Sequence, residues 1–263
     1  MEMQIQKKQM KLLIILFLST FAISNCYAQH NSGASLNKHL NYYKLGIKQI
    51  QEAHNTRLVF NGPEAIYGHY WEYSKNSRIF SIENEIGVCI PFSKSIPALD
   101  FYFKPAELSY LFRTPGKNSL AVGPLVKFEY NYTLYPQLQS GFDYWFTNFS
   151  LGIKTLYNFN LASQSLSVRL KFSLCGFTSR QPDYRNPYFY DIGVKHAVKH
   201  LNSDLEFSTI DKFNSSDFEL SWKPKHESRI TWAYCFNYSG YFEAPEISIV
   251  RHTIRLEFNP KSK

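Results

Sequence analysis

L-S-V-R-L-K-F-S-L-C-G-F, residues Leu166–Phe177, alternates between large apolar side chains and small or charged ones. Every second residue from Leu166 to Leu174 is aliphatic or aromatic, whereas the positions between them include Arg169 and Lys171. Because successive side chains of a β-strand point to opposite faces, this stretch predicts a strand with one apolar and one charged face. Many such strands in one chain are typical of a transmembrane β-barrel, in which the apolar face contacts lipid.

The same alternation returns in nine further segments, so we expect about ten strands. The first two segments are the weakest and leave eight or twelve strands open, and Y-K-L-G-I-K-Q-I in the first also suits a short plug-like segment. Pro105 cannot donate to a strand ladder and therefore predicts a bulge, with a change of parity, in the fourth. The nine segments are Tyr42–Gln51, Ala65–Tyr73, Ile79–Ile90, Ala98–Phe112, Leu120–Tyr132, Phe149–Leu161, Asp217–Trp222, Ser228–Tyr238 and Arg251–Phe258.

The connections between these segments alternate in length, as they do in outer-membrane barrels, which have short periplasmic turns and longer outer loops. The short ones, rich in turn-forming residues, are Ser74–Asn76, Thr114–Asn118, Ala162–Gln164 and Lys223–Glu227. The longer ones include Thr133–Gly141, Thr178–Asn202 and Ser239–Glu246. The expected fold class is therefore all-β: a transmembrane antiparallel up-and-down β-barrel of about ten strands, with both ends in the periplasm.

The N-terminal segment has the features of a secretory signal peptide. Its basic stretch contains Lys7, Lys8 and Lys11, and an apolar run, Leu12–Ile23, follows. This run has about 12 residues, whereas a membrane-spanning helix needs roughly 20. Cys26–Ala28 then provides a small-residue cleavage site. We expect a signal peptide over residues 1–28 and one barrel domain over residues 29–263, located in the outer membrane.

Two alternatives to a cleaved signal and a barrel are weaker. A lipoprotein box ending at Cys26 would be preceded by Asn25, which is bulkier than the small residue usual at that position. After Gln29 there is no long apolar run, and the mean hydropathy of −0.32 agrees. We therefore expect no helical membrane protein.

Composition and charge narrow the class of partner. Aromatic residues make up 17% of the chain, with 19 Tyr and 22 Phe, which aromatic girdles at the two membrane interfaces would use. The formal charge of +8 falls to +6 when Lys7, Lys8, Lys11 and Glu2 leave with the signal. No lysine-rich run or nucleic-acid motif accompanies it. We expect a monomer that contacts outer-membrane lipid, lipopolysaccharide and the barrel-assembly machinery, and no nucleic acid.

Charged side chains collect at the inward positions of the predicted strands, with Glu83 and Glu85 among the acids. A barrel of this size has an interior roughly filled by side chains, so a closed interior held by ion pairs is the main interpretation. A narrow passage for small anionic solutes and a binding cleft remain as alternatives. The lumen-lining charges we expect are Lys127, Glu129, Lys154, Arg169, Lys171, Glu219, Arg229, Arg251, Arg255 and Glu257.

No catalytic constellation is recognisable in the strands. Neither a G-x-S-x-G elbow nor an H-E-x-x-H motif is present. His196 and His200 are four apart in an outer loop, which suits two metal ligands on a helix, but a short solvated helix explains the spacing as well. The start of this loop, with Arg180, Asp183 and Arg185, is either a glycan-binding patch or a self-packed lid. We expect no catalytic residue, metal or cofactor.

Three cysteines remain after the predicted cleavage: Cys89, Cys175 and Cys235. An odd number cannot be fully paired within one chain, and the spacing matches no metal motif. Cys175 and Cys235 share the inward parity of their strands, so either one lumenal disulfide or unpaired thiols would be compatible with the pattern.

The chain resembles the small outer-membrane β-barrel proteins of the Bacteroidota in its Y-A-Q signal end, its single compact barrel and its aromatic alternation. The resemblance covers the whole mature chain without a diagnostic motif, and most of these proteins have no assigned activity. The His-x-Ser-Asn element of lipid A deacylase barrels is missing from S-R-I-T-W-A-Y-C-F-N-Y and V-R-H-T-I-R-L-E-F. We expect a non-enzymatic protein, structural or binding through its outer loops; a channel for anionic solutes and a lipid-modifying enzyme are the alternatives.

Overall fold

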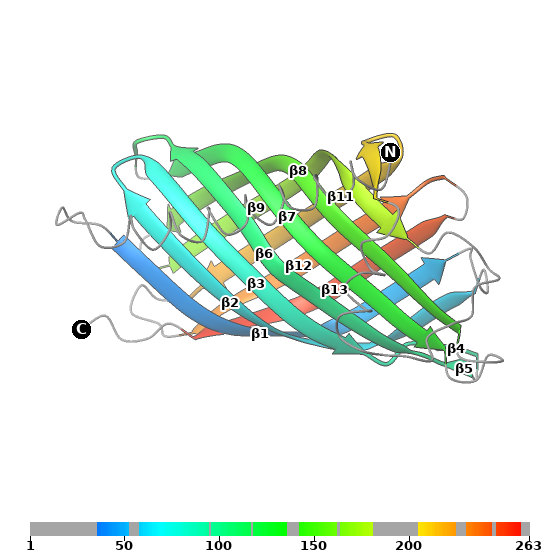
Figure 1. The fold of residues 1–263 in the computed structure, drawn as a ribbon. Helices are drawn as coiled ribbons and strands as arrows, with labels where there is room; N and C mark the ends of the chain where they lie inside the picture. The colour runs from blue at the N-terminus through cyan, green and yellow to red at the C-terminus, as the bar shows by residue number, and fades with distance from the viewer. Residues whose placement is uncertain are drawn as a thin grey trace. The chain divides into compact units, whose positions relative to one another are not determined.

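Ten long antiparallel strands form a closed barrel in the computed structural model (Figure 1). The structure describes residues 36–52, 58–94, 96–116, 118–135, 142–161, 164–180, 205–224, 230–243 and 246–258. The ten barrel strands are β1 (Leu36–Glu52), β2 (Val59–Lys75), β3 (Arg78–Cys89), β6 (Leu99–Arg113), β7 (Ser119–Tyr135), β8 (Phe142–Leu161), β9 (Gln164–Arg180), β11 (Phe213–Lys223), β12 (Ile230–Tyr241) and β13 (Ile247–Phe258). Three short strands accompany them: β4 (Phe92–Ser93), β5 (Ile96–Pro97) and β10 (Glu206–Thr209).

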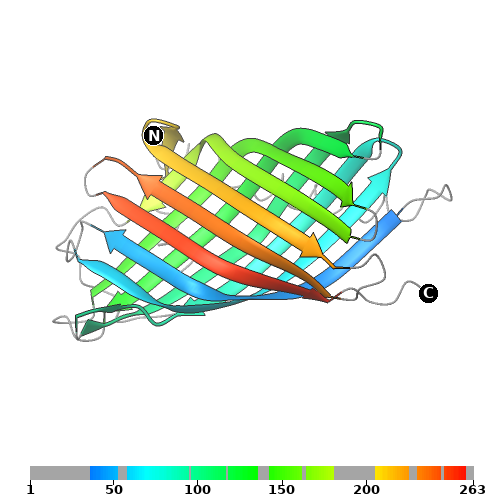
Figure 2. The same cartoon turned by 180° about the vertical axis from the view of Figure 1, so that it is seen from behind.

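Strand β1 closes the barrel. It pairs with β13 from Asn41 opposite Phe258 to Glu52 opposite Ile247, and it also pairs with β2. The remaining barrel strands pair with their neighbours in chain order, and Figure 2 shows from behind that all of them are strongly tilted. The predicted fold class and the count of ten are confirmed, and the segment that also suited a plug is a strand.

Two bulges change the facing of side chains. The pairing of β6 with β7 shifts between Phe103 and Ala106, where Pro105 predicted a bulge. The pairing of β8 with β9 shifts between Leu151 and Gly152, which are opposite Cys175 and Ser173. This second bulge has no proline to signal it. It moves Cys175 off the inward parity that it was expected to share with Cys235, and Cys175 is partly exposed.

The outer surface of the barrel is apolar along most of its strands. Exposed side chains include Leu45, Ile47, Val88, Phe103 and Trp232, all at the outward positions of their strands. An apolar exterior around a polar interior is the pattern of a barrel that crosses a bilayer. Among the described residues, no helix is long and apolar enough to span a membrane. The predicted signal peptide, residues 1–28, lies outside the described residues.

Apolar and charged side chains occupy different levels of the interior. At the end that carries β4 and β5, a cluster of large apolar residues fills the barrel: Phe60, Ala98, Tyr135, Tyr144, Phe146, Phe213, Tyr241, Ile247 and Ile249. Near the short turns at the other end, Ile79, Leu111, Ala121 and Leu156 form a smaller cluster. The buried charged residues of the strands lie between these two levels.

Candidate functional site

The middle of the interior carries as many buried cations as buried anions. The eight cations are Lys44, Lys48, Lys104, Lys127, Lys154, Lys171, Arg251 and Arg255. The eight anions are Glu64, Glu83, Glu85, Asp100, Glu107, Glu129, Glu219 and Glu257. Each of the sixteen lies within 4.0 Å of an opposite charge. The half-buried Arg169 and Asp217 add one charge of each sign.

Nine of the ten predicted lumen charges lie in this interior, and the tenth, Arg229, is outside the described residues. Their inward facing follows from strand parity, since seven of the nine are flanked on both sides by apolar residues of the outward parity. The strand pattern predicts that five of the cations pair with three of the acids, namely Lys127, Arg169, Lys171, Arg229 and Arg255 with Glu129, Glu219 and Glu257. Lys127 contacts Glu129 at 3.2 Å, and Arg255 contacts Glu257 at 2.5 Å.

Six further charged residues were not singled out from the sequence: Lys44, Lys48, Glu64, Asp100, Lys104 and Glu107. Lys44 and Lys48 belong to β1, whose pattern was the weakest. Lys104 and Glu107 flank Pro105, where the bulge reverses parity and obscures the inward face. The parity of Leu45 and Ile47 was the available signal for β1, because it places Lys44 and Lys48 together on the opposite face.

Glu107 has three cation partners in the first of three groups of linked ion pairs. Its carboxylate accepts from Lys171 at 2.7 Å, from Lys104 at 3.4 Å and from Lys154 at 3.5 Å. Glu83 shares two of these cations, with Lys171 at 3.2 Å and Lys104 at 3.6 Å. Three ammonium groups between two carboxylates compensate the desolvation of each charge.

Glu219 forms the centre of the second group. Arg169 donates to its carboxylate at 3.1 Å and Arg255 at 2.5 Å, and the Ser221 hydroxyl donates at 2.9 Å. Arg255 also pairs with Glu257. Because one guanidinium bridges two acids on different strands, this group joins β9, β11 and β13 through the interior.

The third group lies nearer the apolar cluster at the β4–β5 end. Lys48, from β1, pairs with Asp100 and donates to Asn131 at 3.3 Å. Arg251 donates to the same Asn131 oxygen at 2.6 Å and to Glu64 at 3.1 Å. One amide therefore joins two ion pairs, one between β1 and β6 and the other between β13 and β2.

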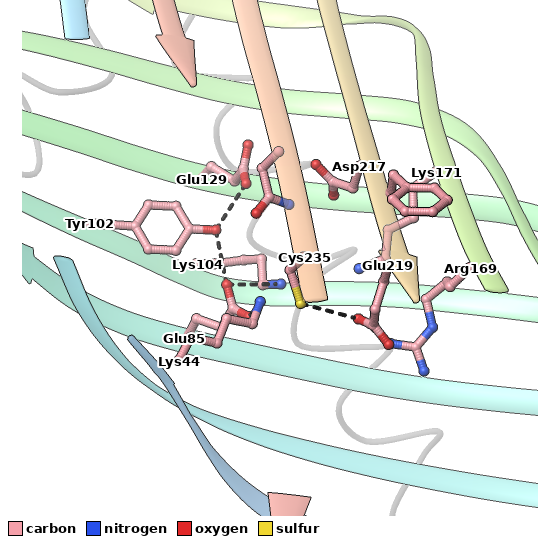
Figure 3. Close-up of a pocket in the computed structure, with 12 residues that line it drawn as sticks. Lys44, Glu85, Tyr102, Lys104, Glu129, Arg169, Lys171, Asp217, Glu219 and Cys235 are labelled. Carbon is pink, nitrogen blue, oxygen red and sulfur yellow. Dashed lines mark hydrogen bonds and ion pairs between the residues drawn. The ribbon is translucent and has the colours of Figure 1, made fainter. Parts of the chain in front are cut away.

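Tyr102 connects two further ion pairs, Lys44–Glu85 and Lys127–Glu129, beside a small cavity. Its hydroxyl lies 3.0 Å from Glu129 and 3.2 Å from Glu85, and Figure 3 shows it between the two acids. The cavity beside it has a volume of about 20 Å³ and is lined by charged side chains that include Lys104 and Asp217. This is room for about one water molecule. The space suits a bridging water and is too small for an organic solute.

Nothing in the described part of the chain is arranged as a metal site, since no group of three or more His, Cys, Asp or Glu side chains there is able to hold an ion. Cys89, Cys175 and Cys235 are unpaired thiols. His252 faces outward, where its Nδ1 lies 2.7 Å from the Tyr234 hydroxyl. The described part of the interior thus contains ion pairs together with hydroxyl and thiol groups hydrogen-bonded to them, such as Ser215, which accepts from Lys127 at 2.7 Å.

Of the outer-loop candidates, the structure describes Arg180 alone; Asp183, Arg185, His196 and His200 lie outside the described residues. The Arg180 guanidinium lies 4.2 Å from the centre of the Tyr241 ring and donates to the Glu243 carbonyl at 3.1 Å. Glu243 also pairs with Lys212 at 2.9 Å, and this hydrogen bond lowers the pKa of its carboxyl. Arg180 is therefore held against the rim of the barrel.

The similarity of this chain to known proteins is distant. No protein-family model matches the chain, and no curated protein matches it. The translocator domain of the autotransporter NalP from Neisseria meningitidis is similar with a TM-score of 0.42 and 7% identity, over 94% of this chain and 96% of that one. The β domain of the Bordetella autotransporter BrkA has a TM-score of 0.41 and 6% identity, over 85% and 100%. An outer-membrane channel from Pseudomonas putida F1 has a TM-score of 0.39 and 7% identity, over 87% and 96%. Likeness at this level says nothing about function, and the fold assignment rests on the strand pairing described above.

Proposed function

We propose that this chain is a non-enzymatic outer-membrane β-barrel whose interior is closed, and that it acts as a structural element or binds partners at its outer loops. One observation carries the proposal: the buried charges of the described strands sum to zero, and each of them has an ionic partner. An anion passage would instead need cations in excess, aimed at a continuous path of water. The balanced, packed interior supports a barrel that does not conduct.

The arrangement of apolar residues supports the same function. The cluster around Phe60, Tyr135 and Phe213 fills the barrel at the β4–β5 end, and the cluster around Leu111 narrows the other. A solute would have to displace both, together with the ion pairs between them. Binding is therefore assigned to the ends of the barrel, where 25 residues, 181–205, separate the end of β9 from the start of β10 in the sequence.

Conductance in a planar lipid bilayer tests the proposal. The refolded protein, inserted as judged by its heat-modifiable mobility in a gel, is expected to give no steady current. A porin inserted into the same bilayer is the positive control for detection. A steady anion-selective current would overturn the closed-interior proposal and favour the channel. A change in lipid A in the mass spectrum of overexpressing cells would overturn the non-enzymatic part.

A further inference from the structure

Polar side chains gather on the outward face of β1, β2 and β3, where neighbouring outward residues such as Tyr43, Leu45 and Ile86 are exposed and apolar. Asn41 on β1 and Asn84 on β3 are exposed, and His69 on β2 is half-buried between them. The register of β2 and β3 places His69 directly opposite Asn84. Side chains paired in this way are neighbours on one face of the sheet. The three residues form what we call the polar patch.

Asn84 lies within the part of the barrel that contacts hydrocarbon. The outward positions of β3 on both sides of it are apolar, from Phe80 and Ile82 on one side to Ile86, Val88 and, just past the strand end, Ile90 on the other. Ten residue steps at about 3.4 Å, tilted by about 40°, span roughly 25 Å along the membrane normal, which is the height of the apolar band of such barrels. Asn84 is four steps from Phe80 and is therefore inside the band.

The hydrogen bonds of the polar patch are incomplete. The Asn41 amide oxygen lies 2.8 Å from His69 Nδ1 and accepts from the Tyr67 hydroxyl at 3.3 Å. The Asn84 amide has no side-chain hydrogen bond to any residue that the structure describes. His252, also on the outward face, differs because Tyr234 satisfies it within the chain. A polar group exposed to hydrocarbon without a partner is costly, so the Asn84 amide calls for a partner in the plane of the membrane.

We infer that a second copy of this chain supplies that partner, by packing its own β1–β3 face against this one around a two-fold axis. A primary amide both donates and accepts, so two Asn84 side chains facing each other across the axis satisfy one another. The patch contains no lysine or arginine, which the phosphates of lipopolysaccharide would require. Ile86, 57% exposed, and its apolar neighbours provide the rest of the contact. This inference replaces the monomer expected from the sequence and is independent of whether the interior conducts.

Sedimentation equilibrium of the refolded full-length protein in detergent micelles tests the role of the amide. Asn84→Leu removes it while keeping a side chain of similar size that is compatible with lipid. The variant is expected to associate about tenfold more weakly than the wild type, the size expected for two hydrogen bonds within a membrane. The matched control is His252→Leu, which also removes an outward polar group and should leave association unchanged. Heat modifiability confirms that both variants fold.

Cross-linking in vesicles tests the face independently of Asn84. In a Cys175→Ser background, Ile86→Cys is expected to form a covalent dimer with a short bismaleimide. Phe172→Cys, on β9 and 48% exposed, should not, because β9 lies four strands away around the barrel. A wild type that is monomeric at every concentration would overturn the inference. So would equal weakening by the two leucine variants, or equal cross-linking at the two cysteine positions.

Discussion

The pair formed by Lys48 and Asp100 gives the sharpest test of a closed interior. Their side chains are 0% and 1% exposed. Removing one member leaves the other charge buried, which costs about 3–5 kcal/mol in comparable interiors. In Lys48→Met, Asp100 keeps the hydrogen bond from Thr133, which is 2.8 Å long in the wild-type structure. In Asp100→Asn, Lys48 keeps its hydrogen bond to Asn131, which is 3.3 Å long there. Because these partners remain, each single variant is expected to lose about 3 kcal/mol of unfolding free energy, the lower end of that range.

The double variant Lys48→Met/Asp100→Asn contains no unpaired charge at this site. It is expected to lose much less unfolding free energy than the two single variants lose together. A coupling of about 3 kcal/mol follows if each single loss is mostly the cost of a stranded charge. Urea unfolding of the vesicle-inserted barrel, followed by tryptophan fluorescence, gives the three free energies from midpoint and slope. The exposed pair Lys212–Glu243 serves as the control and should show little coupling, because water screens it. Additive losses at Lys48 and Asp100 would mean solvated charges and would refute the reasoning.

Two further predictions concern packing. Gly68→Ala is expected to lower the unfolding free energy by about 1–3 kcal/mol through overcrowding, since a Cβ there would lie 2.2 Å from the Tyr42 ring; an unchanged urea midpoint would contradict the packing described. Maleimide labelling of the folded protein followed by mass spectrometry should modify Cys175 and spare Cys89 and Cys235, each 2% exposed, until the protein is unfolded; prompt labelling of either buried thiol would show an open interior.

Strand parity made most of the fold predictable from the sequence, because it depends only on neighbours along the chain. It placed Glu83 and Glu85 inward before any partner was known, and both are buried. Parity says which face a side chain occupies but gives neither the register nor the partner across the barrel. The contact of Lys171 with Glu107 joins residues 64 positions apart and depends on barrel closure. The bulge at Cys175 was missed although the sequence carries a sign of it: Leu174 and Phe177 both face outward but lie on opposite parities, so the alternation is interrupted between them.

Closure and electrostatics are coupled through β1. Of the buried charges that the structure describes, β1 contributes two cations, Lys44 and Lys48, and no anion; the other nine strands contribute six cations and eight anions. A sheet from β2 to β13 without β1 would therefore have an excess of two negative charges on its inward face. Lys44 pairs with Glu85 on β3, and Lys48 with Asp100 on β6, so the strand that completes the hydrogen-bond ladder also neutralises the interior. Because burying unpaired carboxylates is costly, the charge pattern favours the closed barrel over an open sheet, and this gives the polar interior a structural role that requires no solute.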